Sequence, residues 1–236
     1  MDFKNYNSYD FLITFDSNYN SRVAGTPEEL RAGLYIKLLL EEMGYEVHRQ
    51  EFPFFGKKSQ NFIATKQGRS QKNKYTVVVG AHYDCVAAGF GIDDNASGVA
   101  IVLEAAKYFA THPSEFTIVF AFWGAEECGL MGSKFYVNNL GTAYPANDHE
   151  YFERKGIPYI GFESTNWEIG ERDGFTQTTS VGSIWHTRKD KLEYIEKQFP
   201  GRIAKSLETF KMMLIKILND YIYNVDKAIR AKPVFT

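Results

Sequence analysis

The sequence has only two cysteines, a formal net charge of −2 and no long apolar run. Two cysteines cannot form a disulfide framework. Because neither Cys85 nor Cys128 belongs to a cysteine motif, we expect both to pack rather than to react. The small net charge gives no electrostatic reason to bind nucleic acid or an anionic membrane. No apolar run approaches the ~20 residues of a membrane-spanning helix, and the opening residues MDFKNYNSYDFL lack the basic and apolar regions of a signal peptide. These absences predict a cytoplasmic protein with neither nucleic acid nor membrane as a partner.

The composition is otherwise that of a globular protein. Hydrophobic residues make up 44% of the chain and aromatic residues 16%. A chain of 236 residues is long enough to bury a substantial core in one unit. We therefore expect a single domain over residues 1–236.

Three clusters of acidic and imidazole side chains lie where apolar segments begin or end. They are His82-Tyr83-Asp84 after the β-branched run Thr76–Ala81, Asp93-Asp94 within the segment Gly91–Gly98, and Glu126-Glu127 after the run Phe116–Trp123. The middle cluster opens a segment with apolar residues at helical spacing. A strand, helix and strand in this order favour an α/β fold with parallel strands. Ligands of such sheets gather beyond the carboxyl ends of the strands, where two clusters lie.

These residue types favour hydrolysis at zinc. Zinc in proteins binds His nitrogen and Asp or Glu oxygen, and a catalytic site keeps one position for water. Adjacent glutamates suit a division of labour in which one binds the metal and the other accepts a proton from water. A single cluster is equally compatible with a solvated acidic loop. Three clusters at consecutive element boundaries favour the metal site.

The motifs resemble those of the zinc aminopeptidases with co-catalytic metal sites, peptidase family M28. The segments that carry the resemblance are His82-Tyr83-Asp84, Gly91-Ile92-Asp93-Asp94-Asn95-Ala96-Ser97-Gly98, Ala125-Glu126-Glu127 with Gly129-Leu130, Asp148-His149 and Gly156-Ile157-Pro158 through Phe162-Glu163-Ser164. The resemblance covers most of the chain. It implies a three-layer α/β/α fold with a mixed, largely parallel central sheet flanked by helices.

The resemblance also implies a set of metal ligands. His82 would bind one zinc ion, Asp94 would bridge two, and Glu127 would bind the other ion. His186 matches the late histidine of the family and would complete the site that Glu127 begins. The substrate would be a peptide with a free N-terminus.

Two further residues receive roles from the same motifs. Glu126 would act as the general base that takes a proton from the attacking water. Asp84 would orient His82 from behind, which is a common use of a carboxylate near a ligating imidazole.

The chain departs from the family pattern at one place. Family members have a further strand before the Asp148-His149 motif, and it ends in an aspartate that binds the metal on the His82 side. Here residues 132–148 carry no such signal, so an internal segment looks missing. Asp148 and Asp173 are the candidates to replace the aspartate. We therefore expect one tightly bound Zn²⁺, with the second weak or absent.

Capping signals and periodicity predict the remaining elements. Thr26 is the expected N-cap of a helix that ends at Gly44, and Glu29 is expected to complete its capping box. The other expected helices are Asn5–Phe15, Gly129–Leu140, Pro145–Lys155 and Ile203–Val225, the expected strands are Glu46–Phe52, Asn61–Lys66 and Ile157–Glu163, and Asn166–Val181 is expected to be a loop at the mouth of the site.

Two alternatives to the aminopeptidase remain open. A single-zinc acyl transferase of the glutaminyl cyclase type needs one Asp, one Glu and one His, a set that Asp94, Glu127 and His186 supply. A catalytically inactive relative that binds peptides is the second alternative, because of the missing segment. Release of amino acids, cyclisation of N-terminal glutamine, and binding without turnover distinguish the three.

Overall fold

A computed structural model describes residues 6–69, 76–138, 150–153, 155–157, 159 and 184–221. Its centre is a sheet in the order β1-β2-β4-β3, formed by β1 (Val47–Phe54), β2 (Lys57–Lys66), β3 (Thr76–His82) and β4 (Thr117–Trp123). Strands β3 and β4 are parallel, whereas β2 runs antiparallel to both β1 and β4. The expected mixed α/β sheet is therefore confirmed, and within the described residues its parallel part consists of β3 and β4.

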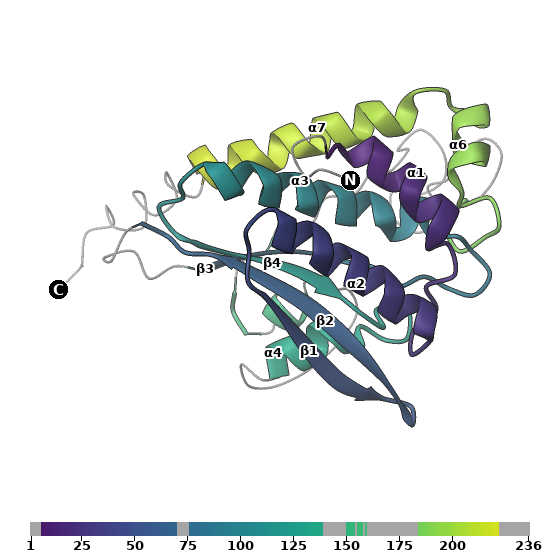
Figure 1. Ribbon diagram of the computed structural model, residues 1–236, viewed down its shortest axis with the longest axis horizontal. Helices are drawn as coiled ribbons and strands as arrows, with labels where there is room; N and C mark the ends of the chain where they lie inside the picture. Colours follow the sequence, from purple (N-terminus) through teal and green to yellow (C-terminus); the bar gives the residue numbers. More distant parts are fainter. Residues whose placement is uncertain are drawn as a thin grey trace.

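Helices cover both faces of the sheet, as Figure 1 shows. On one face lie α2 (Pro27–Glu42) and α3 (Ser97–Thr111), with α1 (Ser8–Asn18) and α7 (Arg202–Lys216) packed outside them. The opposite face carries α4 (Met131–Asn138), near the short α5 (Glu150–Glu153). Helix α6 (Leu192–Gln198) precedes α7, which continues as a wider turn, Ile217–Tyr221.

Strand β4 shows why both faces are covered. Its alternate side chains point to opposite faces. Phe120 and Phe122 join the core under α2 and α3, and Ala121 and Trp123 join the core under α4. All four are fully or almost fully buried. Full burial of a large apolar side chain contributes roughly 1.5–3 kcal/mol. The burial of β4 on both faces therefore fixes the position of Trp123, from which the loop with Glu126 and Glu127 begins.

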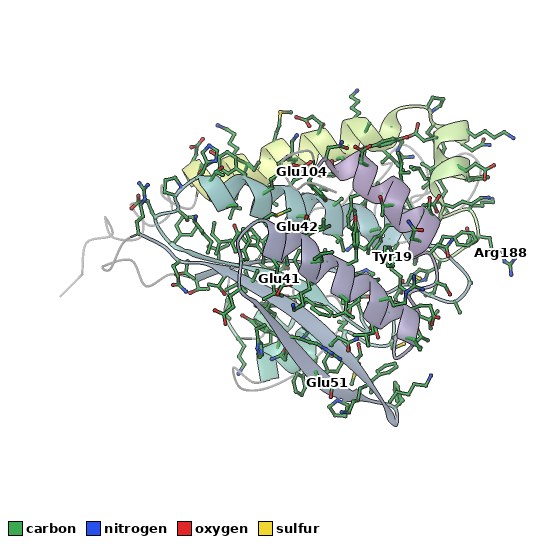
Figure 2. All side chains as sticks on the ribbon, viewed as in Figure 1. Tyr19, Glu41, Glu42, Glu51, Glu104 and Arg188 are labelled. Atoms are coloured by element: carbon green, nitrogen blue, oxygen red, sulfur yellow. The ribbon has the colours of Figure 1, made fainter. Side chains whose placement is uncertain are left out.

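Helix α2 begins where the sequence predicts, but the prediction that Glu29 completes a capping box is wrong. The Thr26 hydroxyl accepts a hydrogen bond from the Glu29 amide at 3.3 Å. The Glu29 carboxylate does not return to Thr26 and instead accepts from the Gly25 amide at 2.7 Å. It turns inward because the buried Ser59 hydroxyl and the Ala125 amide both donate to it. Glu41 and Glu42 lie at the far end of this helix (Figure 2).

Other boundaries shift by a few residues. The first helix starts at Ser8, because the Asn7 side chain caps it by accepting from the Asp10 amide at 2.9 Å. Strand β1 continues through Pro53 to Phe54, so the two predicted strands join directly as a hairpin.

Several expected segments fall wholly or largely outside the described residues. They are most of the helix Pro145–Lys155, most of the strand Ile157–Glu163, the Asp148-His149 pair, Asp173, the loop Asn166–Val181 and the last part of the helix Ile203–Val225.

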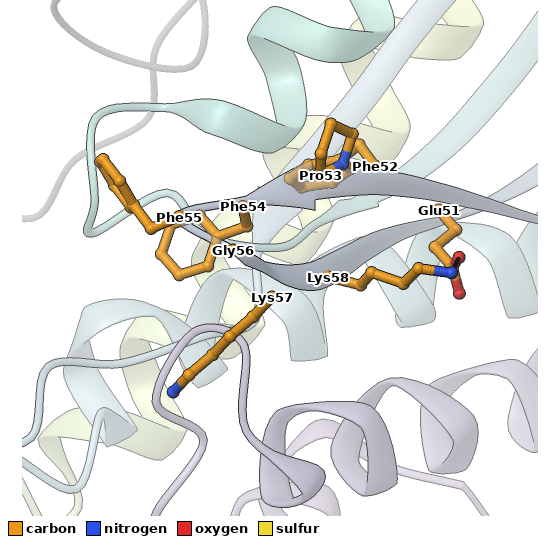
Figure 3. A pocket seen from close by; sticks show the side chains of 8 residues that line it. All are labelled: Glu51, Phe52, Pro53, Phe54, Phe55, Gly56, Lys57 and Lys58. Carbon is orange, nitrogen blue, oxygen red and sulfur yellow. Dashed lines mark hydrogen bonds and ion pairs between the residues drawn. The ribbon is translucent and has the colours of Figure 1, made fainter.

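The hairpin turn projects from the edge of the sheet. Phe55 and Gly56 both have positive φ angles, of 38° and 75°, and Phe55 is 83% exposed. Figure 3 shows residues 51–58, which line a pocket at this turn. None of the six candidate site residues lines it. Beside the turn, Phe54 packs in one cluster with Ala24 and Ala125, so the base of the hairpin reaches the loop that follows β4. Within the described ranges, no helix is both long and apolar enough to cross a membrane.

Candidate metal centre and active site

The parallel pairing of β3 and β4 brings two of the predicted clusters together. His82, the last residue of β3, pairs in register with Trp123, the last residue of β4. The Tyr83 amide donates to the Trp123 carbonyl at 2.9 Å, which extends the pairing by one step. The loops after these strands therefore leave the same edge of the sheet side by side.

The third cluster reaches this edge through an irregular turn, Ile92–Ala96, at the start of α3. Gly91 before it has φ 66°, and a Cβ atom there would lie 2.5 Å from Arg22 Nη2, so both the conformation and the space require glycine. Asp94 has extended angles of φ −114° and ψ 90° within the turn. Asn95 then accepts from the Gly98 amide at 3.0 Å and satisfies one free N–H group of α3.

Asp94 lies between two imidazoles. Its Oδ1 atom is 3.1 Å from His82 Nε2, and its Oδ2 atom is 3.1 Å from His186 Nε2. His186 Nε2 is also 2.9 Å from Glu127 Oε2. Glu126 Oε2 lies on the other side, 3.8 Å from His82 Nε2. The structure thus brings together residues that are spread over more than one hundred positions of the sequence.

Asp84 holds the backbone that carries both glutamates. It is completely buried. One of its oxygens accepts from the Glu126 amide at 3.0 Å and the other from the Glu127 amide at 3.2 Å. The oxygen that accepts from the Glu126 amide, Oδ1, also lies 3.6 Å from His82 Nδ1. The sequence led us to expect a contact with His82 alone, so the hydrogen bonds to the glutamate loop are a second, unforeseen connection.

Burial and mutual charge shift the pKa values of this cluster. Burial opposes protonation of His82, yet Asp84, Asp94 and Glu126 together raise its pKa well above the usual value. Burial acts to raise the pKa of Asp94, but His82 and then His186 hold it below its usual range. Burial and the charge of Asp94 raise the pKa of Glu127 to about 7. The site therefore holds more negative charge than it can easily stabilise.

A divalent cation fits this surplus. One buried polar atom of the cluster, Glu127 Oε1, has no hydrogen-bond partner among the described residues. Ligand atoms of His82, Asp94 and Glu127 lie within 4.8 Å of one another. Imidazole nitrogen and carboxylate oxygen are the donors that zinc takes. The residues present thus suit a zinc ion by donor type, spacing and charge.

The backbone conformation at His186 is unusual. Its φ angle is 58°, a left-handed value that is uncommon for a residue other than glycine. Its ring meets the exposed Trp185 ring edge to face, with centroids 4.4 Å apart. The residue before the glutamate pair, Ala125, has φ 53°. Such conformations cost energy and concentrate at functional sites.

Three buried charged residues that support the cluster were not among the sequence candidates. Arg22 donates to the Tyr83 carbonyl at 2.6 Å and to the Gly91 carbonyl at 2.8 Å. Glu29 accepts from the Ala125 amide at 3.1 Å, just before the two glutamates. The third is Asp190.

The sequence held weak signals for two of these residues. Arg22 lies in the segment Ser21–Pro27 before α2, and Asp190 follows His186 by four positions. Neither signal specifies a partner. Both cysteines are free. Cys85 is buried, as expected, whereas Cys128 is exposed, so the expectation that it packs is wrong.

The fold and the cluster define an α/β protein with a candidate metal centre at the carboxyl ends of its parallel strands. The chain belongs to peptidase family M28, whose model matches residues 61–146 and 140–210.

Comparison with individual proteins finds similarity to aminopeptidases and to a glutaminyl cyclase. Aminopeptidase YwaD of Bacillus subtilis is 33% identical over 246 residues, covering 82% of this chain and 52% of that protein. The chain therefore spans about half the length of this relative. BSAP, a zinc aminopeptidase from Bacillus subtilis, has the same fold, with a TM-score of 0.74 at 16% identity over 91% of this chain and 95% of that one. Porphyromonas gingivalis glutaminyl cyclase has a TM-score of 0.65 at 18% identity, over 88% and 97% of the two chains.

Proposed function

We propose that this chain is a zinc-dependent aminopeptidase unit that removes N-terminal residues from peptides with a free N-terminus. The observation that carries the proposal is the position of Asp94, whose two carboxylate oxygens each face a different histidine while Glu127 approaches one of them. Membership of peptidase family M28 and the fold of a zinc aminopeptidase support the reaction class.

Asp94, Glu127 and His186 would hold one zinc ion tightly. Three protein ligands with one place for water are the usual set for catalytic zinc. On the other side, His82 and the second oxygen of Asp94 are the ligands available among the described residues, so these two groups would hold a second ion. When bound, zinc supplies a Lewis acid that lowers the pKa of water and polarises a carbonyl group.

Glu126 is the proposed proton carrier. It accepts the proton of the attacking water and delivers it to the amine that leaves. Asp84 keeps Glu126 beside Glu127 by accepting hydrogen bonds from both amides. Its Oδ1 atom lies 3.6 Å from His82 Nδ1, and this distance supports a second role for Asp84, that of orienting the His82 ring.

The two adjacent glutamates offer a matched pair of variants. Glu126→Gln should lower turnover by roughly 10²–10⁴-fold, the usual contribution of general acid–base catalysis, with zinc content unchanged. Glu127→Gln should lose zinc as well as activity. Peptide hydrolysis and zinc content are measured on the same preparations. Zinc loss in Glu126→Gln with retention in Glu127→Gln would mean that the two roles are exchanged.

A glutaminyl cyclase activity is the second candidate. The Asp94, Glu127 and His186 set matches its single-zinc requirement, and the fold likeness to a glutaminyl cyclase favours it. Incubation of the protein with peptides that begin with glutamine separates the reactions. Free amino acids indicate the peptidase, and loss of the N-terminal amine without cleavage indicates the cyclase.

The cytoplasmic location of the protein stays a prediction.

A further inference from the structure

Asp190 is a buried carboxylate outside the proposed ligand set. Only 1% of its surface is exposed, although His186, four positions earlier, and Arg188 are both exposed. Arg188 projects outward at the edge of the molecule in Figure 2. One oxygen of Asp190 accepts from the Asp93 amide at 2.6 Å, and the other accepts from the Asp94 amide at 3.3 Å. Both hydrogen bonds therefore end on the turn that carries Asp94.

The segment between His186 and Asp190 is short and tightly folded. The Thr187 amide and hydroxyl both donate to the Ile184 carbonyl, at 3.3 and 2.6 Å. The Asp190 amide then donates to the Thr187 carbonyl at 3.1 Å. A movement of Asp190 thus moves His186 with it. Asp190 is the point where the segment bearing His186 is tied to the turn bearing Asp94.

We propose that Asp190 is a positioning residue that sets the distance between the Asp94 carboxylate and the His186 imidazole, and so controls how tightly the centre binds zinc. This inference rests on the proposed metal centre. A carboxylate suits the role because it offers two acceptors and no donor to two neighbouring N–H groups. An asparagine of the same shape turns one acceptor into a donor, which then faces an N–H group.

The test compares Asp190→Asn with Glu104→Gln in the full chain. Glu104 on α3 is the matched control, because its carboxylate also accepts a hydrogen bond from a backbone amide, that of Ser8 at 2.9 Å, but this bond ties α3 to α1 and involves no proposed ligand. Zinc affinity is measured by competition with a chromophoric chelator, and the melting temperature is measured on metal-free protein. We expect Asp190→Asn to weaken zinc binding about 10–100-fold, as loss of groups that orient ligands does. Glu104→Gln should change the melting temperature alone.

Zinc affinity of Asp190→Asn within threefold of wild type would overturn the proposal, as would an equal loss in Glu104→Gln. A visible absorption spectrum of the Co²⁺-substituted proteins gives a second readout that stability alone does not move. We expect Asp190→Asn to change its intensity, and an unchanged spectrum counts against the proposal.

A measurement on metal-free wild type covers the case in which the variant does not fold. Amide hydrogen exchange at Asp93 and Asp94 should be slow, since both N–H groups are held by Asp190. Exchange at the rate of free amides would overturn the proposal without any variant. Wild-type protein that binds no zinc would overturn the proposed function. Slow exchange at the Asp93 and Asp94 amides would still show that the hydrogen bonds to Asp190 exist, whether or not the proposed function holds.

Discussion

Arg22 is the residue whose replacement should damage this protein most without touching a proposed ligand. Its guanidinium is completely buried and donates to four backbone carbonyls. They are those of Tyr83 at 2.6 Å, Tyr19 at 2.9 Å, Phe90 at 2.9 Å and Gly91 at 2.8 Å. Arg22 therefore ties the loop after β3 to the segment that enters the Asp94 turn and to the end of α1.

The change Arg22→Met keeps the apolar stem and removes every donor. A hydrogen bond to a charged group contributes about 1.5–3 kcal/mol, so four contribute roughly 6–12 kcal/mol. Burial of the guanidinium itself costs several kcal/mol, and the variant recovers that cost. We expect a net loss of about 3–5 kcal/mol, the range found when one partner of a buried charged contact is removed. For a chain of this size, that is a fall in melting temperature of roughly 6–20 °C.

The assay is thermal unfolding of the metal-free protein, followed by circular dichroism. Arg31→Met is the matched control, because the exposed Arg31 guanidinium lies over the Tyr19 ring at 5.8 Å, a contact worth about 0.5–1 kcal/mol. Arg22→Lys should recover only part of the loss, since a single ammonium cannot reach all four carbonyls. A loss below about 1 kcal/mol in Arg22→Met, or equal losses in Arg22→Met and Arg31→Met, would refute this reasoning.

Three other outcomes follow from the site and its surroundings. His186→Ala should empty the tight zinc site, whereas His82→Ala should keep most of its zinc after dialysis. Zinc content is measured by elemental analysis, and two ions per wild-type chain would contradict the expectation of one tightly bound ion. Replacement of both Cys85 and Cys128 by alanine should leave activity within a few-fold, and inactivation with the metal retained would instead indicate a thiol mechanism. Burial raises the pKa of Glu29 from 4.5 to about 7, so the folded chain binds this proton more tightly than the unfolded chain does. The free energy of unfolding should therefore fall by at most about 3 kcal/mol as the pH rises from ~4.5 to ~7. In denaturant titrations, Glu29→Gln should make the free energy of unfolding depend less on pH over this range. An unchanged pH dependence would contradict the raised pKa of Glu29.

Local sequence determined the elements and their order. The β-branched run before His82 and the apolar run before Glu126 predict strands, and both strands are present with the acidic residues directly after them. Thr26 caps α2 as predicted, because capping depends on residues three positions apart. The convergence of the clusters was also predictable, since parallel neighbours end at one edge of a sheet.

Only the tertiary structure decided which buried charges meet which partners. The sequence suggested that Glu29 would cap its own helix, but it reaches the Ala125 amide, 96 positions away. Asp190 reaches the Asp93 amide, 97 positions away, and Arg22 reaches Gly91, 69 positions away. The partners are backbone N–H and C=O groups, which every non-proline residue carries, so residue type gives no sign of them. Their availability depends on which turns the packed sheet and helices leave unpaired, and that is settled only when distant segments have come together.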